Sequence, residues 1–346
     1  MEGFEVSSCK IIFEIGPTLH NEEAAIQLIG IAADAGADAV KVQILNSKNL
    51  VNDPNQMFTY GILGDQGEII TIEEPLQEIL KRRELGKESW IRISEYARSL
   101  NLDFIVTVTD IEDLNWIKNI YFQGIKIASG DITYIPLIKK AAELGKQIHV
   151  DTGTATLEEI QNALDVIYES GNDDVVIHHC PPGYPAPDEK IFLKTVSFLR
   201  EQFKVKIAFS DHSVGWHMDI AALALGANTL EKTLTLNRKT RSPEHIFSLE
   251  ATDAKKFVSD VRAVERAINS GVRRVTTSDQ HSIMPIRRSA FYATDISVGD
   301  TLTESQIKFQ RPGSHLNSIQ ALNLIGRRLN KDVTSGEPIS LDDFYD

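Results

Sequence analysis

The first 270 residues show a repeated pattern in which a short apolar run is followed by an amphipathic segment. In the first repeat, Lys10-Ile11-Ile12-Phe13-Glu14 has the composition of a strand, and Asn21 is placed to cap a helix that ends near Gly36. A strand, a capped helix and a glycine stop form one βα unit. Further runs of this kind give eight predicted strands, which begin at Lys10, Asp38, Phe104, Gly124, Gln147, Asp174, Val205 and Asn228.

The repetition predicts an α/β fold, a (β/α)8 TIM barrel over residues 1–270, because right-handed crossovers leave few other ways to connect eight parallel strands. A doubly wound open sheet is the main alternative. That fold predicts a glycine-rich dinucleotide-binding turn after the first strand, and Gly16-Pro17-Thr18-Leu19-His20 does not have this pattern. The sequence therefore favours the barrel.

Two segments depart from the repeat. Residues 45–86 form a long insertion after the second strand, with a helical pattern at its end, and such an insertion is expected to lie over the active-site end of a barrel. Residues 271–285 are rich in Arg, Ser and Thr and lack periodicity, which predicts a linker. Residues 286–346 contain short β-like pieces separated by turns and are expected to form a small β-rich domain.

Composition narrows the possible partners. The net charge of −13 argues against a nucleic-acid partner, and no apolar run approaches the roughly 20 residues that span a bilayer, so we expect no membrane segment. Cys9 and Cys180 are too few and too far apart for a disulfide framework or a zinc site. These features predict a cytoplasmic protein with free thiols.

Polar residues cluster where several predicted strands end. Ser210-Asp211-His212 places a hydroxyl, a carboxylate and an imidazole in consecutive positions. A helix cap needs fewer polar groups than this, so we expect a small charged ligand there. Lys41 and Lys126 lie inside apolar runs, where an unpaired ammonium is costly. Each must therefore bind an anionic ligand or form an internal ion pair with a carboxylate.

The ordered motifs resemble the sialic acid synthase family over nearly the whole chain. The matching segments are Phe13-Glu14-Ile15-Gly16, residues 35–43, Lys126-Ile127-Ala128-Ser129-Gly130-Asp131, residues 152–160, Tyr184-Pro185-Ala186-Pro187, Ser210-Asp211-His212 and residues 286–346. The resemblance implies that residues 286–346 form an antifreeze-like (SAF) domain. It also implies a condensation of phosphoenolpyruvate with the open-chain aldehyde of an N-acylated aminosugar, which gives a nonulosonic, sialic-acid-like 2-keto acid and releases phosphate.

The resemblance also assigns roles to residues. It implies catalytic roles for Glu14, His212 and Glu231, a metal contact for His212, and substrate binding by Lys41, Gln43, Thr107, Lys126, Ser129, Asp131, Asp151, Tyr184, Ser210 and Arg311. It further implies that Arg311 reaches the barrel of a second subunit, in a domain-swapped homodimer. From the residues alone, Thr107, Ser129 and Ser210 could instead cap helices, and Glu14 could be a buried ion-pair partner.

The sequence departs from the family pattern at one of the two positions where the family has metal-binding histidines. A second family histidine is replaced by Thr233, whose neutral hydroxyl is a weak ligand for manganese, although magnesium tolerates it. The need for a divalent metal, Mn or Mg, therefore stays open.

Two other positions also depart. Asp151 replaces a phosphate-facing serine and Pro182 a polar residue. Since an ionised Asp151 would repel a phosphate, it either points elsewhere, joins a relocated metal site with His212, or marks a different mode of anion binding. In the pair His178-His179, strand alternation predicts that one ring enters the barrel.

Two alternatives to the condensation remain. One is a divergent paralogue that acts on a different aldehyde or a different donor. The other is a non-catalytic barrel that has lost its metal site.

Overall fold

The computed structural model describes residues 8–271 and 276–345. By the contacts between its residues, the chain divides into two compact units, Met1–Ser270 and Gly271–Asp346. Residues 272–275, in the predicted linker, lie outside the described part of the chain. In the described residues, no helix is both long enough and apolar enough to cross a membrane.

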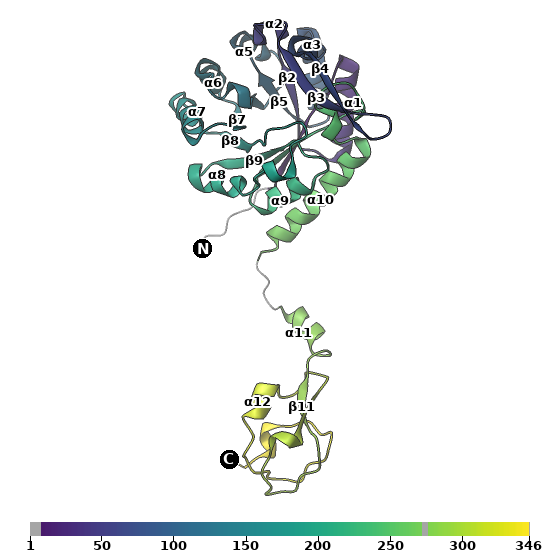
Figure 1. Ribbon diagram of the computed structural model, residues 1–346. Helices are drawn as coiled ribbons and strands as arrows, with labels where there is room; N and C mark the ends of the chain where they lie inside the picture. Colours follow the sequence, from purple (N-terminus) through teal and green to yellow (C-terminus); the bar gives the residue numbers. More distant parts are fainter. Residues whose placement is uncertain (1–7, 272–275, 346) are drawn as a thin grey trace. The chain divides into compact units, whose positions relative to one another are not determined.

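The first unit is a closed parallel barrel, which confirms the predicted fold class (Figure 1). Within the described residues its eight strands follow the order β1-β10-β9-β8-β7-β6-β5-β2, and β1 pairs with both β2 and β10. The strands are β1 (Lys10–Glu14), β2 (Ala39–Ile44), β5 (Asp103–Val108), β6 (Gly124–Ile127), β7 (Gln147–Asp151), β8 (Val175–His179), β9 (Lys206–Asp211) and β10 (Thr229–Thr233).

Helices surround the strands, and their ends follow the signals in the sequence (Figure 1). The Asn21 side chain accepts a hydrogen bond from the Ala24 amide, and Gly36 ends the same helix with a φ of 86°. Thr156 and Glu159 form a capping box. The helices are α1 (Glu22–Ala35), α4 (Lys87–Ser99), α5 (Ile111–Ile117), α6 (Ile135–Ala142), α7 (Leu157–Glu169), α8 (Thr195–Phe203), α9 (His217–Ala224) and α10 (Ala251–Asn269).

The barrel interior changes character along its axis. Ile12, Ala39 and Ile105 form a small apolar cluster inside it. Each lies two residues before a polar residue on the same strand, and residues two apart share one face of a strand. The apolar layer therefore supports a polar layer nearer the C-terminal strand ends, where active sites of such barrels lie.

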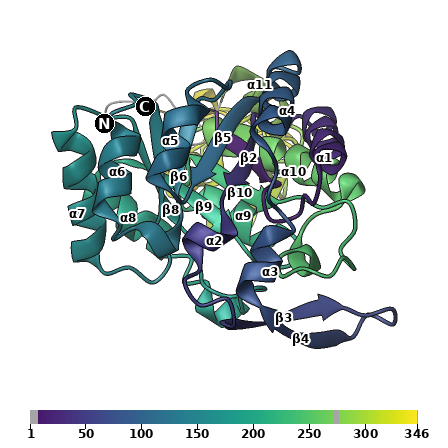
Figure 2. The ribbon, with the colours of Figure 1, turned by 90° about the horizontal axis from the view of Figure 1, so that it is seen from above.

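The insertion after β2 contains α2 (Ser47–Leu50), β3 (Met57–Leu63), β4 (Ile69–Pro75) and α3 (Leu76–Lys81). The predicted helical end of the insertion is thus confirmed as α3. Strands β3 and β4 pair as an antiparallel ribbon that projects from the barrel (Figure 2). After α3, the Arg83 side chain donates to Ser242 Oγ at 3.2 Å, which ties the insertion to the loop after β10.

The second unit has its own apolar core, which includes Ala290, Tyr292 and Leu302. It contains α11 (Thr277–Ile283), β11 (Ser289–Tyr292), β12 (Ile307–Gln310) and α12 (Ser318–Leu322), and β11 pairs with β12 in antiparallel fashion. The segment expected to be aperiodic therefore holds a helix, α11. Short 3-10 turns complete both units: η1 (Ser129–Asp131), η2 (Asp188–Lys190), η3 (His245–Phe247), η4 (Glu304–Gln306) and η5 (Leu341–Asp343).

Candidate active site

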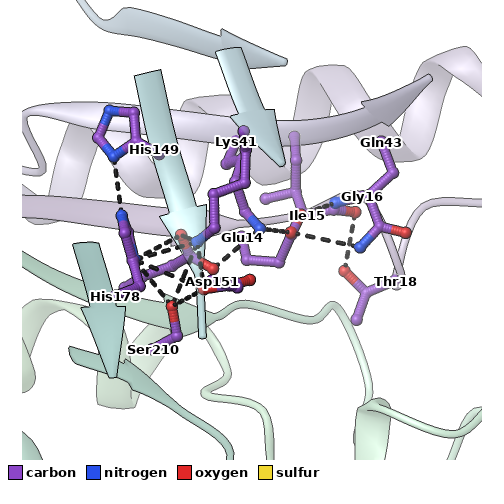
Figure 3. A network of polar contacts seen from close by, with 12 residues as sticks. Glu14, Ile15, Gly16, Thr18, Lys41, Gln43, His149, Asp151, His178 and Ser210 are labelled. Atoms are coloured by element: carbon purple, nitrogen blue, oxygen red, sulfur yellow. Dashed lines mark hydrogen bonds and ion pairs between the residues drawn. The ribbon is translucent and has the colours of Figure 1, made fainter. Parts of the chain in front are cut away.

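Charged side chains from separate strands meet inside the barrel (Figure 3). Lys41 Nζ on β2 lies 2.5 Å from Glu14 Oε2 on β1 and 2.9 Å from Glu231 Oε1 on β10. Lys126 Nζ on β6 lies 2.7 Å from Glu231 Oε2 and 2.9 Å from Asp151 Oδ1 on β7. With His149, His178 and Ser210, these five residues form what we call the polar network.

Lys126 is the centre of the polar network. Its side chain is fully buried, and its ammonium group also lies 3.0 Å from His178 Nδ1 and 3.3 Å from Ser210 Oγ. An ammonium group has three protons to donate. The three shortest contacts, to Glu231, Asp151 and His178, account for all of them.

His149 and His178 form a buried pair that the sequence only partly indicated. Strand alternation predicted one inward ring in the pair His178-His179, and His178 is that residue, while His149 was not singled out. His149 Nδ1 lies 2.8 Å from His178 Nε2. Burial, followed by the charge of Lys126, holds the pKa of both imidazoles well below the usual range, so both rings are neutral.

The polar network contains more carboxyl groups than ammonium groups. Burial acts to raise the pKa of Glu231, but Lys126 and Lys41 outweigh it and hold that pKa well below its usual range. Burial acts to lower the pKa of Lys41, and Glu14 and Glu231 raise it well above its usual value. Burial raises the pKa of Glu14 despite its contact with Lys41. Two ammonium groups thus face three carboxyl groups, because Asp151 adds the third.

Other residues predicted to bind substrate lie within the polar network or beside it. Gln43 Nε2 donates to Glu14 Oε2 at 3.4 Å, and Ser210 Oγ donates to Asp151 Oδ1 at 3.1 Å. Thr107 is paired in register with Gln43 and Lys126 on the neighbouring strands. Its buried Oγ1 has no hydrogen-bond partner among the described residues, so this hydroxyl is free to bind a ligand.

An aromatic group lies at the strand ends beside the polar network. The rings of Tyr184 and His212 are 4.9 Å apart, and Phe247 lies 5.6 Å from His212. His212 Nδ1 contacts Pro181 O at 3.2 Å, and burial lowers the pKa of the imidazole. Tyr184, which is 41% exposed, presents an aromatic surface suited to the apolar face of a sugar.

Two charged residues of this region were missed from the sequence. Arg83, on the insertion, is 6% exposed, and its Nε has no partner among the described residues. Burial lowers the pKa of Arg83, whereas the negative charges of Glu244 and Glu14 raise it. Burial raises the pKa of Glu244 to about 7. No sequence pattern marks either residue, because both lie on long connections after strands.

Three further predicted residues lie on other parts of the chain. Ser129 and Asp131 lie on η1 after β6, and neither is buried. Asp131 is half-buried, and this partial loss of contact with water raises its pKa to about 6. Arg311 lies in the second unit and is exposed. The substrate roles of all three stay predictions.

The residues expected to hold a metal do not form a strong metal site. Thr233, paired in register with Glu14, offers only a neutral hydroxyl, so His212 supplies the one imidazole of the expected pair. Among the described residues, no group of three or more His, Cys, Asp or Glu side chains could hold a metal ion. The Asp151 carboxylate contacts Lys126 and Ser210.

Asp211, the middle residue of Ser210-Asp211-His212, lies outside the polar network. Its carboxylate pairs with the fully buried Lys232, which also donates to Ser213 O at 2.6 Å and lies 3.9 Å from Asp219 Oδ2. Burial and the neighbouring Asp211 charge raise the pKa of Asp219 well above its usual range. This second cluster anchors the loop that carries His212.

Comparison with known proteins identifies the family. The sequence models of the NeuB family and the SAF domain match residues 28–273 and 287–344, respectively. The chain is 32% identical over 333 residues to an N,N'-diacetyllegionaminic acid synthase of Campylobacter jejuni, covering 95% of this chain and 98% of the relative. It is 29% identical over 343 residues to a pseudaminic acid synthase of Helicobacter pylori, covering 96% and 97%.

A solved structure agrees with this assignment. An N-acetylneuraminic acid (sialic acid) synthetase from Leptospira borgpetersenii, in complex with citrate, superposes with a TM-score of 0.69 at 27% identity, covering 80% of this chain and 90% of that one. The resemblance found in the motifs is thereby confirmed. The chain belongs to the NeuB family and carries a SAF domain.

Proposed function

We propose that this protein condenses phosphoenolpyruvate with the aldehyde of an N-acylated aminosugar to form a nonulosonic, sialic-acid-like 2-keto acid. The observation that carries the proposal is the pair of buried ammonium groups, Lys41 and Lys126, at the C-terminal end of a NeuB-family barrel. Relatives named as synthases of N,N'-diacetyllegionaminic acid and of pseudaminic acid support the class of product.

In this reaction, C3 of phosphoenolpyruvate forms a bond to the aldehyde carbon, water adds at C2, and the C–O bond to phosphate breaks. Lys41 and Lys126 supply positive charge for the carboxylate and phosphate of the donor, and Thr107 and Ser210 supply hydroxyl groups. Glu14 lies against Lys41, where a proton can pass to the aldehyde oxygen as it becomes an alkoxide. Glu231 holds both ammonium groups in place.

The acceptor sugar lies on the other side of the reacting carbon. Gln43, next to Glu14, and Tyr184, next to His212, border that space and would bind its hydroxyl groups. Ser129 and Asp131 on η1 complete the proposed substrate set. No step is assigned to a metal ion, because His212 and Thr233 do not make a strong site.

We further propose that the working form is a cytoplasmic homodimer. Its buried free thiols, Cys9 and Cys180, fit a reducing compartment. The exposed Arg311 of the SAF domain would bind substrate in the barrel of the other subunit, so the second unit would take part in the reaction. Support for this arrangement comes from the family resemblance of the Arg311-Pro312-Gly313 segment.

The test is phosphate release by the purified protein with phosphoenolpyruvate and a panel of N-acylated hexosamines, with and without added manganese or magnesium. We expect phosphate in step with a new 2-keto acid detected by mass spectrometry. Absence of phosphate with every sugar in every metal condition would contradict the proposal.

One observation favours a second candidate, which keeps the fold but uses a different donor. Asp151 places a carboxylate against Lys126, and a dianionic phosphate bound at the same ammonium would be repelled. Isothermal titration separates the two candidates. A different donor predicts no binding of phosphoenolpyruvate at millimolar concentration to the wild-type protein or to variants of Asp151.

A further inference from the structure

The two ammonium groups of the polar network differ in how many of their protons are already donated to acceptors. Lys126 gives its three protons to Glu231, Asp151 and His178, at 2.7, 2.9 and 3.0 Å. Lys41 contacts two acceptors in the described part of the chain, Glu14 and Glu231, and keeps one proton. An incoming anion therefore finds a donor at Lys41 but none at Lys126.

Asp151 is the residue that closes Lys126 to a ligand. Its Oδ1 accepts from Lys126 and also from Ser210 Oγ at 3.1 Å, so one carboxylate oxygen occupies two donors. His178 and Glu231 also bind Lys126, but each has a further partner that holds it in place, namely His149 at 2.8 Å and Lys41 at 2.9 Å. For Asp151, no other partner is recorded among the described residues beyond Lys126, Ser210 and a 3.8 Å contact to His178.

Burial distinguishes the three carboxylates. The side chains of Glu14 and Glu231 are 5% and 6% exposed, whereas that of Asp151 is 11% exposed. Of the three, Asp151 therefore gains contact with water with the least displacement. Glu231 bridges two ammonium groups, and its departure would leave both without a partner.

A second, independent feature indicates that a ligand binds beside Lys126. Thr107 Oγ1 is buried and without a partner in the described residues, and Thr107 pairs in register with Lys126 on the adjacent strand. A buried hydroxyl without a partner costs free energy unless a ligand or water satisfies it. Thr107, Lys126 and Ser210 would together give an anion two hydroxyl groups and one ammonium group.

We propose that Asp151 is an internal counter-anion that sets the anion affinity of this site: its carboxylate occupies the Lys126 and Ser210 donors and turns away when the phosphate of the donor substrate binds. The inference rests on the proposed function for the identity of the anion. No bond is made or broken in this step, because one anion replaces another at the same protons.

The experiment measures the dissociation constants of phosphoenolpyruvate and of inorganic phosphate by isothermal titration for the wild-type protein and for Asp151→Ser, Asp151→Asn and Asp151→Glu. We expect Asp151→Ser to bind both anions at least about tenfold more tightly than the wild type, which is about 1.4 kcal/mol. Asp151→Asn, which removes the charge but keeps the size, should gain less. Asp151→Glu keeps the charge and should bind as weakly as the wild type.

Two further variants locate the effect. Lys126→Met in the Asp151→Ser background should abolish the gain, because the freed proton belongs to Lys126. Asp103→Asn is the matched control, since Asp103 pairs with Lys10 at 2.6 Å at the opposite end of the strands and should leave anion affinity unchanged. Thermal unfolding of each variant checks the fold, and Asp151→Asn carries the test if Asp151→Ser does not fold.

Equal anion affinity in the wild type, Asp151→Asn and Asp151→Ser would overturn the inference, as would an equal gain in Asp151→Glu. The proposed function fails on a different result, namely the absence of phosphate release with any sugar. A gain in affinity for inorganic phosphate without turnover would keep the inference and remove the proposed reaction.

Discussion

His149 Nδ1 lies 2.8 Å from His178 Nε2, and both rings are fully buried inside the barrel. Because Lys126 donates to His178 Nδ1, His178 must carry its proton on Nε2 and donate it to His149. His149 then also carries its proton on Nε2. Nitrogen NMR of the histidine-labelled protein should show two neutral rings of this tautomer that do not titrate between pH 5 and pH 8.

The contacts of this histidine pair also predict that substitution of His178 lowers the stability of the fold. His178→Leu removes the acceptor of one Lys126 proton and leaves His149 Nδ1 without a partner, so the free energy of unfolding should fall by about 2 kcal/mol. Urea unfolding at pH 7 measures this, with His281→Leu, at an exposed position of α11, as a control that changes little. An imidazolium signal from either buried ring near pH 6 would refute the assigned tautomers.

Lys41 should be the main electrostatic contact for the donor substrate before Asp151 moves, because one of its protons is uncommitted. We expect Lys41→Met to weaken phosphoenolpyruvate binding roughly a hundredfold, since a charged donor is lost from a buried site. Lys10→Met is the control, because Lys10 pairs with Asp103 at the other end of the barrel. Unchanged affinity in Lys41→Met would exclude Lys41 from the anion site.

The cluster of Lys232, Asp211 and Asp219 predicts a strong asymmetry between two substitutions. Lys232→Met leaves Asp211 as a buried, uncompensated charge and should lower the free energy of unfolding by about 3 kcal/mol. Asp219→Asn should cost less than about 1 kcal/mol, because the raised pKa of Asp219 means that its carboxyl group is already neutral. Equal losses in the two variants, measured by urea unfolding, would contradict this assignment.

Glu244 predicts a pH dependence of stability. Its folded-state pKa of about 7 lies above the usual value of 4.5, so between these values the folded protein holds a proton that the unfolded chain releases. Stability from this group is therefore present below about pH 4.5 and is lost as the pH rises to 7. Glu244→Gln should be more stable than the wild type at pH 8, by on the order of 1 kcal/mol, and not at pH 5.

Chemical unfolding of both proteins at the two pH values makes this comparison. A difference between them that does not change with pH would show that Glu244 is already ionised in the folded protein below pH 7.

The proposed homodimer predicts complementation between two inactive variants. Lys126→Met removes a substrate-binding side chain from the barrel, and Arg311→Ala removes one from the SAF domain. Neither homodimer should therefore be active. In a mixed dimer, one active site combines an intact barrel with an intact Arg311 from the other subunit. Random mixing should restore about a quarter of wild-type phosphate release, whereas sites built within single subunits would restore none.

Much of the barrel followed from the sequence, because its strands and helices carry local signals. The starts of the eight predicted strands fall within one residue of those in the structure, and Asn21, Gly36 and Thr156 act as helix ends in the structure. The ribbon of β3 and β4 was missed, since its exposed strands lack the apolar alternation of a buried sheet. Helix α11 was missed because its seven residues are too polar to show a buried face.

The site was harder to predict than the fold. Residues such as Lys41 and Lys126 were found because a charge inside an apolar run needs a partner. Whether that partner was a ligand or a carboxylate could not be decided, since Glu14, Asp151 and Glu231 lie on strands far apart in sequence. The structure shows carboxylate partners for both lysines. Arg83 and Glu244, on connections without a recognisable motif, lie close enough for the charges of Glu14 and Lys41 to affect their pKa values.

Gly124, the first residue of β6, makes room for this arrangement. A side chain there would place its Cβ 3.3 Å from His149 Nε2 and 3.2 Å from His149 Cδ2. His149 contacts His178, and His178 contacts Lys126 and Ser210, so pressure on His149 would be passed on to the groups that face the substrate. A single methyl group at the N-terminal end of β6 would thus shift side chains at the C-terminal ends of the strands. Libraries that vary Gly124 therefore offer a way to change the activity of the enzyme without altering any residue that touches its substrates.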